Sequence, residues 1–82
     1  MILVDVFVPS VDVTYDFQLN EAIPVGTVIE EIAEMVGQKE QCRIVGDVGN
    51  LQICDKKSGL ALDKRRTLLD CEIQTGDRLI LI

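Results

Sequence analysis

The feature that most constrains the fold is an unbroken apolar run, Leu79 to Ile82, at the end of this 82-residue chain. A turn signal over residues 75–77, Thr-Gly-Asp, precedes the run, and together they are typical of a short closing β-strand. A strand this apolar needs cover on at least one face, and so short a chain can build only one hydrophobic core. We therefore expect a single domain, residues 1–82, in which the other elements cover this strand.

The first twenty residues predict a β-hairpin. Residues 2–8 form a β-branched run, and residues 13–20 alternate between apolar and polar side chains. Asp5 sets the orientation of the first strand, because its carboxylate favours the solvent face and successive side chains point to opposite faces. Leu3 and Phe7 then share the outer face with Asp5. The inner face carries Ile2, Val4, Val6, Val8, Val13, Tyr15, Phe17 and Leu19.

A helical pattern follows the hairpin. Residues 27–30, Thr-Val-Ile-Glu, match a capping box, in which the Thr hydroxyl and the Glu carboxylate accept hydrogen bonds from backbone N–H groups. Apolar residues then recur at helical spacing as far as Val36, opposite three glutamates that we interpret as a solvated helix face. Gly37 is expected to end the helix as a left-handed cap.

The second half of the chain predicts a loop and two short strands before the closing one. Residues 38–50 are mostly polar and are expected to form a loop. Residues 51–55 alternate, which points Gln52 and Cys54 outward, and residues 60–62 are expected to form a short return strand after a turn. The chain then has about five strands and one long helix.

One helix can cover one face of a sheet, and the inward residues supply one apolar layer for it. The helical crossover after the hairpin predicts that the first and last strands pair in parallel at the centre of the sheet. The expected fold class is α+β, a ubiquitin-like β-grasp with an approximately five-stranded mixed sheet packed on one helix.

Charge and composition exclude several functions. The net charge is −6, which disfavours nucleic-acid binding because phosphate contacts require clustered Lys and Arg. The chain has no His, the most common general base and metal ligand, so we expect no catalytic residues, no metal and no cofactor. Cys42, Cys54 and Cys71 lack the close spacing of a disulfide framework or a zinc site. No stretch resembles a signal peptide or a membrane-inserting segment.

Two resemblances are visible toward the C-terminus. Residues 62–74 resemble the corresponding strand, loop and turn of ubiquitin, with Thr67, Leu68, Asp70, Ile73 and Gln74 at matching places. The stretch that ends at Leu79 is similar to the YukD-like (EsaB-like) ubiquitin-fold family of bacterial type VII secretion systems. That family shares the ending Leu-x-Asp-x-x-Ile-x-x-Gly-Asp-x-Leu.

The resemblance implies a small cytoplasmic protein that binds other proteins, as an accessory or regulatory component of a type VII (WXG100/ESX) secretion system. Its implied partners are a secretion ATPase or a membrane subunit. Two alternatives remain open. The chain could be the cytoplasmic domain of a membrane secretion subunit, or a ubiquitin-like modifier or sulfur carrier. The second is disfavoured, because a modifier exposes a C-terminal Gly-Gly, whereas here bulky residues follow Gly76.

Two surfaces are candidate binding sites. Exposed apolar patches commonly mark interfaces, so the outer sheet face is the first hypothesis, for a partner protein or for a homodimer. Its residues are Leu3, Phe7, Gln52, Cys54, Ile80 and Ile82. The alternatives are that the loop at residues 38–50 covers this face, or that the strand register differs by one residue and these side chains belong to the core. The second surface is a basic patch for an acidic partner or a membrane surface, with a solvated loop as the plainer interpretation. Its residues are Lys56, Lys57, Lys64, Arg65 and Arg66.

Overall fold

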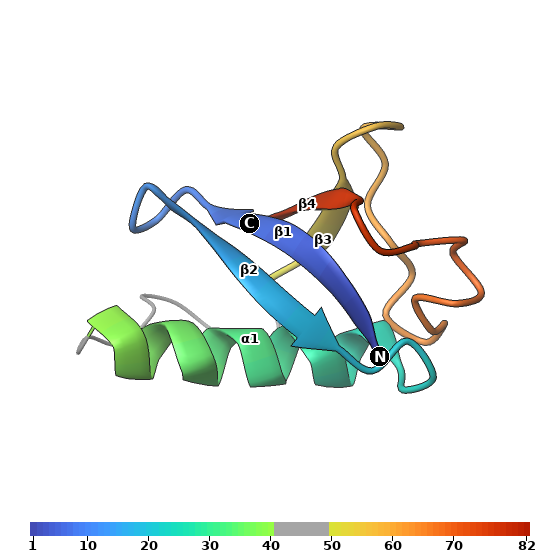
Figure 1. Ribbon diagram of the computed structural model, residues 1–82, viewed down its shortest axis with the longest axis horizontal. Helices are drawn as coiled ribbons and strands as arrows, with labels where there is room; N and C mark the ends of the chain where they lie inside the picture. The colour runs from blue at the N-terminus through green and yellow to red at the C-terminus, as the bar shows by residue number, and fades with distance from the viewer. Residues whose placement is uncertain (41–49) are drawn as a thin grey trace.

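A computed structural model describes residues 1–40 and 50–82, where one sheet packs on one helix (Figure 1). The strands are β1 (Ile2–Val8), β2 (Val13–Leu19), β3 (Ile53–Asp55) and β4 (Arg78–Leu81), and the helix is α1 (Val25–Glu40). The strand order in the sheet is β2-β1-β4-β3. The two central strands, β1 and β4, run parallel and the other neighbours run antiparallel, which confirms the predicted topology.

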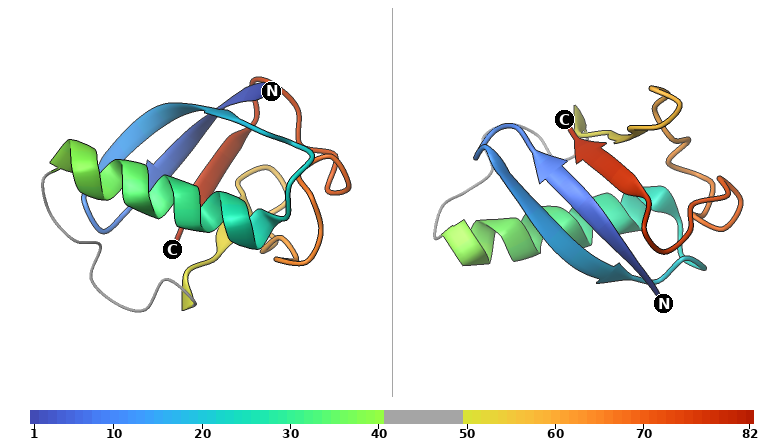
Figure 2. Two further views of the ribbon diagram at one scale, coloured as in Figure 1. Left: turned by 90° about the horizontal axis from the view of Figure 1, so that it is seen from below. Right: turned by 45° about the horizontal axis from the view of Figure 1, so that its top comes forward.

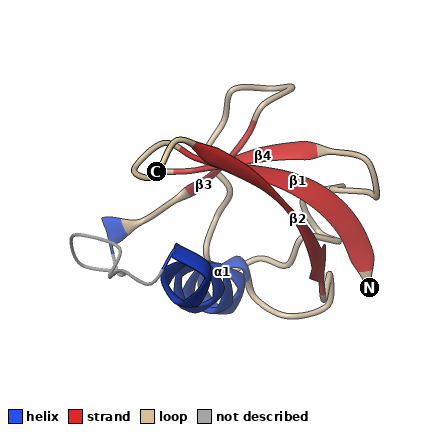
Figure 3. Ribbon diagram, turned by 60° about the vertical axis from the view of Figure 1, so that its left-hand side comes forward, coloured by secondary structure: helices blue, strands red, loops and turns tan. Residues whose placement is uncertain are grey.

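The central pairing explains why the closing strand is so apolar. β4 lies between β1 and β3, and the helix lies across one face of the sheet (Figures 2 and 3). The parallel pairing begins at a turn in which Gly76 adopts a positive φ of 95° and donates its N–H to the carbonyl of Leu3 at 2.9 Å. An L side chain at Gly76 would be strained there, so the predicted turn signal has a physical basis.

The inner sheet face and the helix form the core. Side chains that alternate along β1, β2 and β4 meet the apolar stripe of α1, and Leu68 and Ile73 reach the same core from the turn before β4. Complete burial of each such aliphatic side chain contributes about 1.5–3 kcal/mol. The buried residues of the three strands and the helix are Val4, Val6, Val8, Phe17, Leu19, Val25, Val28, Ile29, Ile32, Val36, Leu79 and Leu81.

The predicted helix boundaries are wrong at both ends. The helix begins at Val25, before the expected Thr27 cap, because carbonyl groups from another segment satisfy its first N–H groups. Val25 N–H donates to the carbonyl of Arg66 at 2.7 Å, and Gly26 N–H donates to that of Lys64 at 3.0 Å. The helix also continues past Gly37 to Glu40, so the loop predicted from residue 38 begins later. Residues 41–49 of that loop lie outside the described part of the chain.

The sheet has four strands within the described residues, one fewer than expected. The predicted return strand over residues 60–62 forms a single bridge, between Ala61 and Cys54. Two backbone hydrogen bonds flank this bridge, from Asp55 N–H to Leu60 O at 2.9 Å and from Leu62 N–H to Ile53 O at 2.8 Å. The contact is too short to continue as a ladder, since β3 itself has only three residues.

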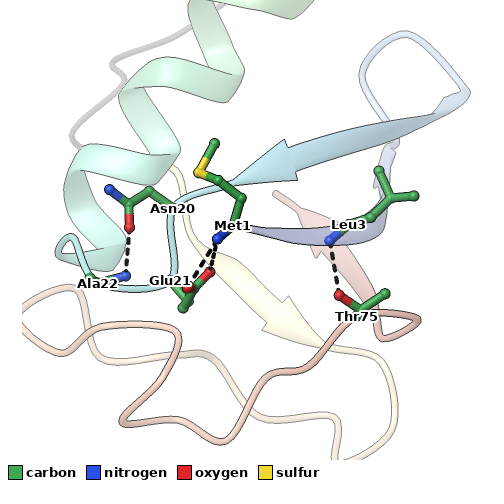
Figure 4. A network of polar contacts seen from close by, with 6 residues as sticks. All are labelled: Met1, Leu3, Asn20, Glu21, Ala22 and Thr75. Carbon is green, nitrogen blue, oxygen red and sulfur yellow. Dashed lines mark hydrogen bonds and ion pairs between the residues drawn. The ribbon is translucent and has the colours of Figure 1, made fainter.

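Side-chain hydrogen bonds hold the turns around the first strand. Leu3 N–H donates to Thr75 Oγ1 at 3.2 Å, which ties β1 to the turn before β4 (Figure 4). In the same view the ammonium group of Met1 lies 3.1 Å from the Glu21 carboxylate. In the turn before β4, Asp70 Oδ2 accepts the N–H of Thr67 at 3.3 Å and Thr67 Oγ1 accepts the N–H of Asp70 at 3.0 Å, so each side chain caps the other's backbone. Of these contacts, the hydrogen bond from Leu3 to Thr75 fixes the start of β1 relative to the turn before β4.

Candidate protein-interaction face

The sheet face away from α1 carries the predicted apolar residues, and we call it the outer face. The register places Phe7 beside Ile80 and Ile80 beside Cys54, so these three side chains cross β1, β4 and β3 in one line, the apolar row. All three are half-buried. Leu3 and Ile82 lie on the same face and are 52% and 55% exposed. Ile82 follows Ile80 toward the end of the chain, whereas Asp5 separates Leu3 from Phe7 along β1, so the exposed apolar surface is divided.

Gln52 joins this face at its far edge. Its N–H donates to the carbonyl of Ile82 at 2.6 Å, and Ile82 N–H donates back to the carbonyl of Gln52 at 2.9 Å. This pair extends the β3–β4 pairing beyond both strands, because the same register places residue 52 opposite residue 82. The six residues predicted for the outer face therefore lie on three adjacent strands and their extensions.

A second line, the charged row, runs beside the apolar row. Its members are Asp16 on β2, Asp5 on β1, Arg78 on β4 and Lys56 just after β3. The register pairs Asp16 with Asp5 and Asp5 with Arg78, and Lys56 N–H donates to the carbonyl of Arg78 at 3.1 Å. Two acids therefore lie toward one edge of the sheet and two bases toward the other.

The charged row was not predicted as a unit: Lys56 was a candidate residue of the basic patch, but Asp5, Asp16 and Arg78 were not among the predicted site residues. The alternation already placed Asp5 and Asp16 on the outer face, but each looked like an ordinary solvent-facing carboxylate. Arg78 and Lys56 join them through long-range pairing of β1, β4 and β3. Only the register of the sheet could reveal that row.

The two acids interact directly. A hydrogen bond between protonated Asp16 and Asp5 favours the neutral form of Asp16, the negative charge of Asp5 disfavours the ionised form, and both effects raise the pKa of Asp16. The charge of Lys39 opposes this shift. Like charges directly opposite each other in a sheet destabilise the pairing, so this edge favours a neighbouring positive group.

A shallow depression of about 330 Å³ lies between the two rows. Its lining includes Asp5, Phe7, Thr14, Lys56 and Arg78, which come from four separate segments of the sheet. An apolar floor with opposite charges at its two sides can accept an apolar side chain flanked by charged groups. It offers no arrangement of nucleophile and base for a reaction.

The structure separates the predicted basic residues into two places. Lys56 and Lys57 lie beside Arg78 and line a groove next to the charged row. Lys64 and Arg65 instead line a hollow beside the first turn of α1, where the Lys64 carbonyl caps the helix. Arg66 is exposed and its carbonyl caps the same turn. The first pair therefore belongs with the outer face, and the other three belong with the helix start.

The described cysteines do not form a reactive centre. Cys54 and Cys71 are free thiols in different parts of the fold, and Cys42 lies outside the described residues. Burial raises the pKa of the Cys71 thiol, partly offset by the charge of Arg66, which disfavours the thiolate that nucleophilic chemistry requires. Within residues 1–40 and 50–82, no three His, Cys, Asp or Glu side chains converge as metal ligands.

No helix in the described part of the chain is both long enough and apolar enough to span a bilayer. In sequence, residues 2–81 match the family model described as "WXG100 protein secretion system (Wss), protein YukD". No curated protein matches the chain.

Several solved structures share the fold. The EccD5 ubiquitin-like domain from Mycobacterium xenopi superposes with a TM-score of 0.79 at 21% identity, over 99% of this chain and 91% of that one. Ubiquitin from Caldiarchaeum subterraneum gives a TM-score of 0.73 at 17% identity, over 99% of this chain and 90% of the other. A structure of ATBAG1 in complex with HSP70 gives 0.75 at 13% identity, over 100% of this chain and 40% of that chain. At these identities the likeness establishes the ubiquitin-like fold.

Proposed function

Because the chain belongs to the YukD family of the WXG100 protein secretion system, we propose that it is a non-enzymatic, non-conjugating protein-binding component of that system. The observation that carries the proposal is the apolar row of the outer face, Phe7, Ile80 and Cys54, with Ile82 exposed beside it and Leu3 exposed on the far side of the charged row. Apolar surface that the described residues leave uncovered favours docking to another protein.

The charged row adds specificity to this face. Charges beside an apolar contact favour partners with complementary charge and disfavour others, and they also accelerate encounter. Asp5 and Arg78 lie next to Phe7 and Ile80 in the register, so a docked partner would contact both rows together. The proposed partners are a secretion ATPase or a membrane subunit, met at the cytoplasmic side of the membrane.

A second candidate is that the chain acts as the cytoplasmic domain of a larger membrane subunit of the secretion system. The observation that favours it is the likeness to the EccD5 ubiquitin-like domain, at a TM-score of 0.79. In both candidates the outer face binds a protein. The complete reading frame distinguishes them, because the second requires transmembrane helices in the same polypeptide.

The test is an affinity pull-down from native cytoplasm and membranes with Phe7→Ser and Ile80→Ser variants. These half-buried side chains contribute part of their surface to the outer face, so each change is expected to reduce recovery of the secretion component about tenfold or more. Leu69→Ser is the matched control, since Leu69 is 65% exposed and lies in the turn before β4.

Circular dichroism of each variant shows whether the fold persists. Folded Phe7 and Ile80 variants that recover the secretion ATPase or membrane subunit as well as the unaltered protein would exclude the outer face as its binding site. Equal loss in the Leu69 control would show that the effect is not specific to this face.

A further inference from the structure

The charges of the charged row reverse sign across the midline of the sheet. From β2 to β3 the order is Asp16, Asp5, Arg78 and Lys56, so the two acids and the two bases lie at mirrored distances from the boundary between β1 and β4. In the apolar row, Phe7 and Ile80 lie on the two sides of the same boundary, and Thr14 on β2 mirrors Cys54 on β3. A face with this pattern is complementary to itself.

The complementarity follows from a two-fold axis parallel to the strands, above the boundary between β1 and β4. Rotation about this axis places residues at the same height along the strands opposite each other, and it brings the β1 side of one copy over the β4 side of the other. Asp5 of one copy then faces Arg78 of the other, Asp16 faces Lys56, and Phe7 faces Ile80. The same contacts occur twice, as in the isologous interface of a symmetric dimer.

We propose that the outer face binds a second copy of this chain, sheet against sheet, with the charged rows in opposite orientation. The proposal rests on the proposed function in one respect, that the outer face is a binding surface, and it names the occupant. Stacked sheets with strands nearly aligned are an ordinary packing geometry. In the dimer the repelling pair Asp5 and Asp16 gains the positive partners that each copy places toward the other edge.

The size of the face sets the expected strength. Four strands about 4.8 Å apart, with up to seven residues at about 3.3 Å each, give a face of roughly 20 by 20 Å. That area corresponds to a small, transient contact, so we expect a dissociation constant of about micromolar to millimolar. The overall charge of −6 opposes the dimer at long range, whereas the complementary rows favour it at contact.

Sedimentation velocity across protein concentrations measures the association of the unaltered protein. We expect a monomer–dimer equilibrium within the range accessible up to about 1 mM. In a dimer of Asp5→Arg, each introduced arginine faces Arg78 of the other copy, and in a dimer of Arg78→Asp each introduced aspartate faces Asp5. Like charges then meet across the interface, so each variant is expected to dimerise more weakly by a factor of about ten or more. Each change acts twice because of the two-fold symmetry.

Mixing the two variants isolates the contact between copies. In the mixture, the arginine introduced at position 5 of the first variant faces the aspartate introduced at position 78 of the second. The unaltered Asp5 of the second variant faces the unaltered Arg78 of the first, so association is expected to return to about the level of the unaltered protein. Neither protomer regains its own Asp5–Arg78 neighbour pair, so restored folding cannot explain the recovery. Glu31→Arg and Arg65→Asp make the same charge changes on exposed residues away from the outer face and serve as controls.

A monomer at the highest concentration overturns the proposal, as does a mixture that associates no better than its components. Undiminished dimers of both single variants also overturn it, because the dimer would then use another face. These results leave the proposed function intact if Phe7→Ser and Ile80→Ser still lose the secretion component. The opposite result is also distinguishable. If the Phe7→Ser and Ile80→Ser variants still recover the secretion component, and the mixture of charge variants recovers the dimer, then the proposed function is wrong and the dimer is supported.

Discussion

At the level of single residues, the fold shifts the pKa values of the Asp16 and Asp63 carboxyl groups in opposite directions. Asp16 lies opposite Asp5 across the hairpin; a hydrogen bond to Asp5 favours protonated Asp16 and the charge of Asp5 disfavours ionised Asp16, so the pKa of Asp16 is raised. Asp63 accepts the N–H of Arg65 at 2.9 Å, and this bond, with the charge of Arg65, lowers the pKa of Asp63. Both groups are accessible to solvent, so the effects on stability are small but differ in sign.

Asp16→Asn is expected to raise the free energy of unfolding at neutral pH, because it removes repulsion between two ionised carboxylates. A raised pKa means that the folded state binds the proton more tightly, so stability is lost as pH rises through that pKa. The gain from Asp16→Asn should therefore fade as the pH is lowered toward about 2. Urea unfolding over a series of pH values measures it.

Asp63→Asn provides the matched comparison, with the opposite sign. A lowered pKa gives stability that is present above the ordinary value for Asp and is lost as pH falls through the folded pKa. The variant should be less stable than the unaltered protein at neutral pH and equal to it near pH 2, an approximate limit. A gain in stability at neutral pH from Asp63→Asn would contradict the assigned hydrogen bond.

At the element scale, the start of α1 shows how tertiary contacts replace a local cap. The sequence places a capping box at residues 27–30, but the first N–H groups are those of Val25 and Gly26, and the carbonyls of Arg66 and Lys64 accept them. A helix end is stabilised by whichever acceptor reaches its unpaired donors. Here the acceptors come from a segment about forty residues later in the chain, which no local pattern can indicate.

Thr27→Ala and Thr67→Ala test this difference between caps. The Thr67 hydroxyl accepts the N–H of Asp70 at 3.0 Å, so its loss is expected to lower the free energy of unfolding by about 1 kcal/mol. Thr27 lies inside the first helical turn, where its loss is expected to change stability by less than about 0.5 kcal/mol. Chemical denaturation measures the stability of both variants. A larger loss of stability from Thr27→Ala than from Thr67→Ala would show that the local capping box does cap the helix.

At the scale of the whole molecule, the turn before β4 is part of the core as well as a connection. Leu68 is 0% exposed and lies in the same buried cluster as the strands and the helix, whereas its neighbour Leu69 is 65% exposed. One helix and four short strands leave an end of the core open, and Leu68 with Ile73 closes it. The family motif around these residues therefore has a structural role in packing.

Leu68→Ala is expected to lower the free energy of unfolding by about 2–5 kcal/mol, because it leaves a cavity in a core that can collapse only partly. Leu69→Ala should change it by less than about 0.5 kcal/mol, as exposed positions usually do. Thermal and urea unfolding measure both. Similar costs at the two positions would mean that the turn does not insert Leu68 into the core.

Three features could be predicted from the amino-acid sequence alone: which face of each main strand is apolar, that one helix covers the sheet, and that the first and last strands pair in parallel. These follow from local periodicity and from the need of Leu79 and Leu81 for cover, and the structure confirms them. The predicted return strand was limited to one bridge by the shortness of β3. The start of α1 and the position of Lys64 beside the helix were instead decided by contacts between distant segments. The same holds for the charged row: alternation assigns a residue to a face, but which residues become neighbours across that face depends on register. The apolar closing run could therefore be predicted as a central strand, whereas only the tertiary structure could place Arg78 beside Asp5.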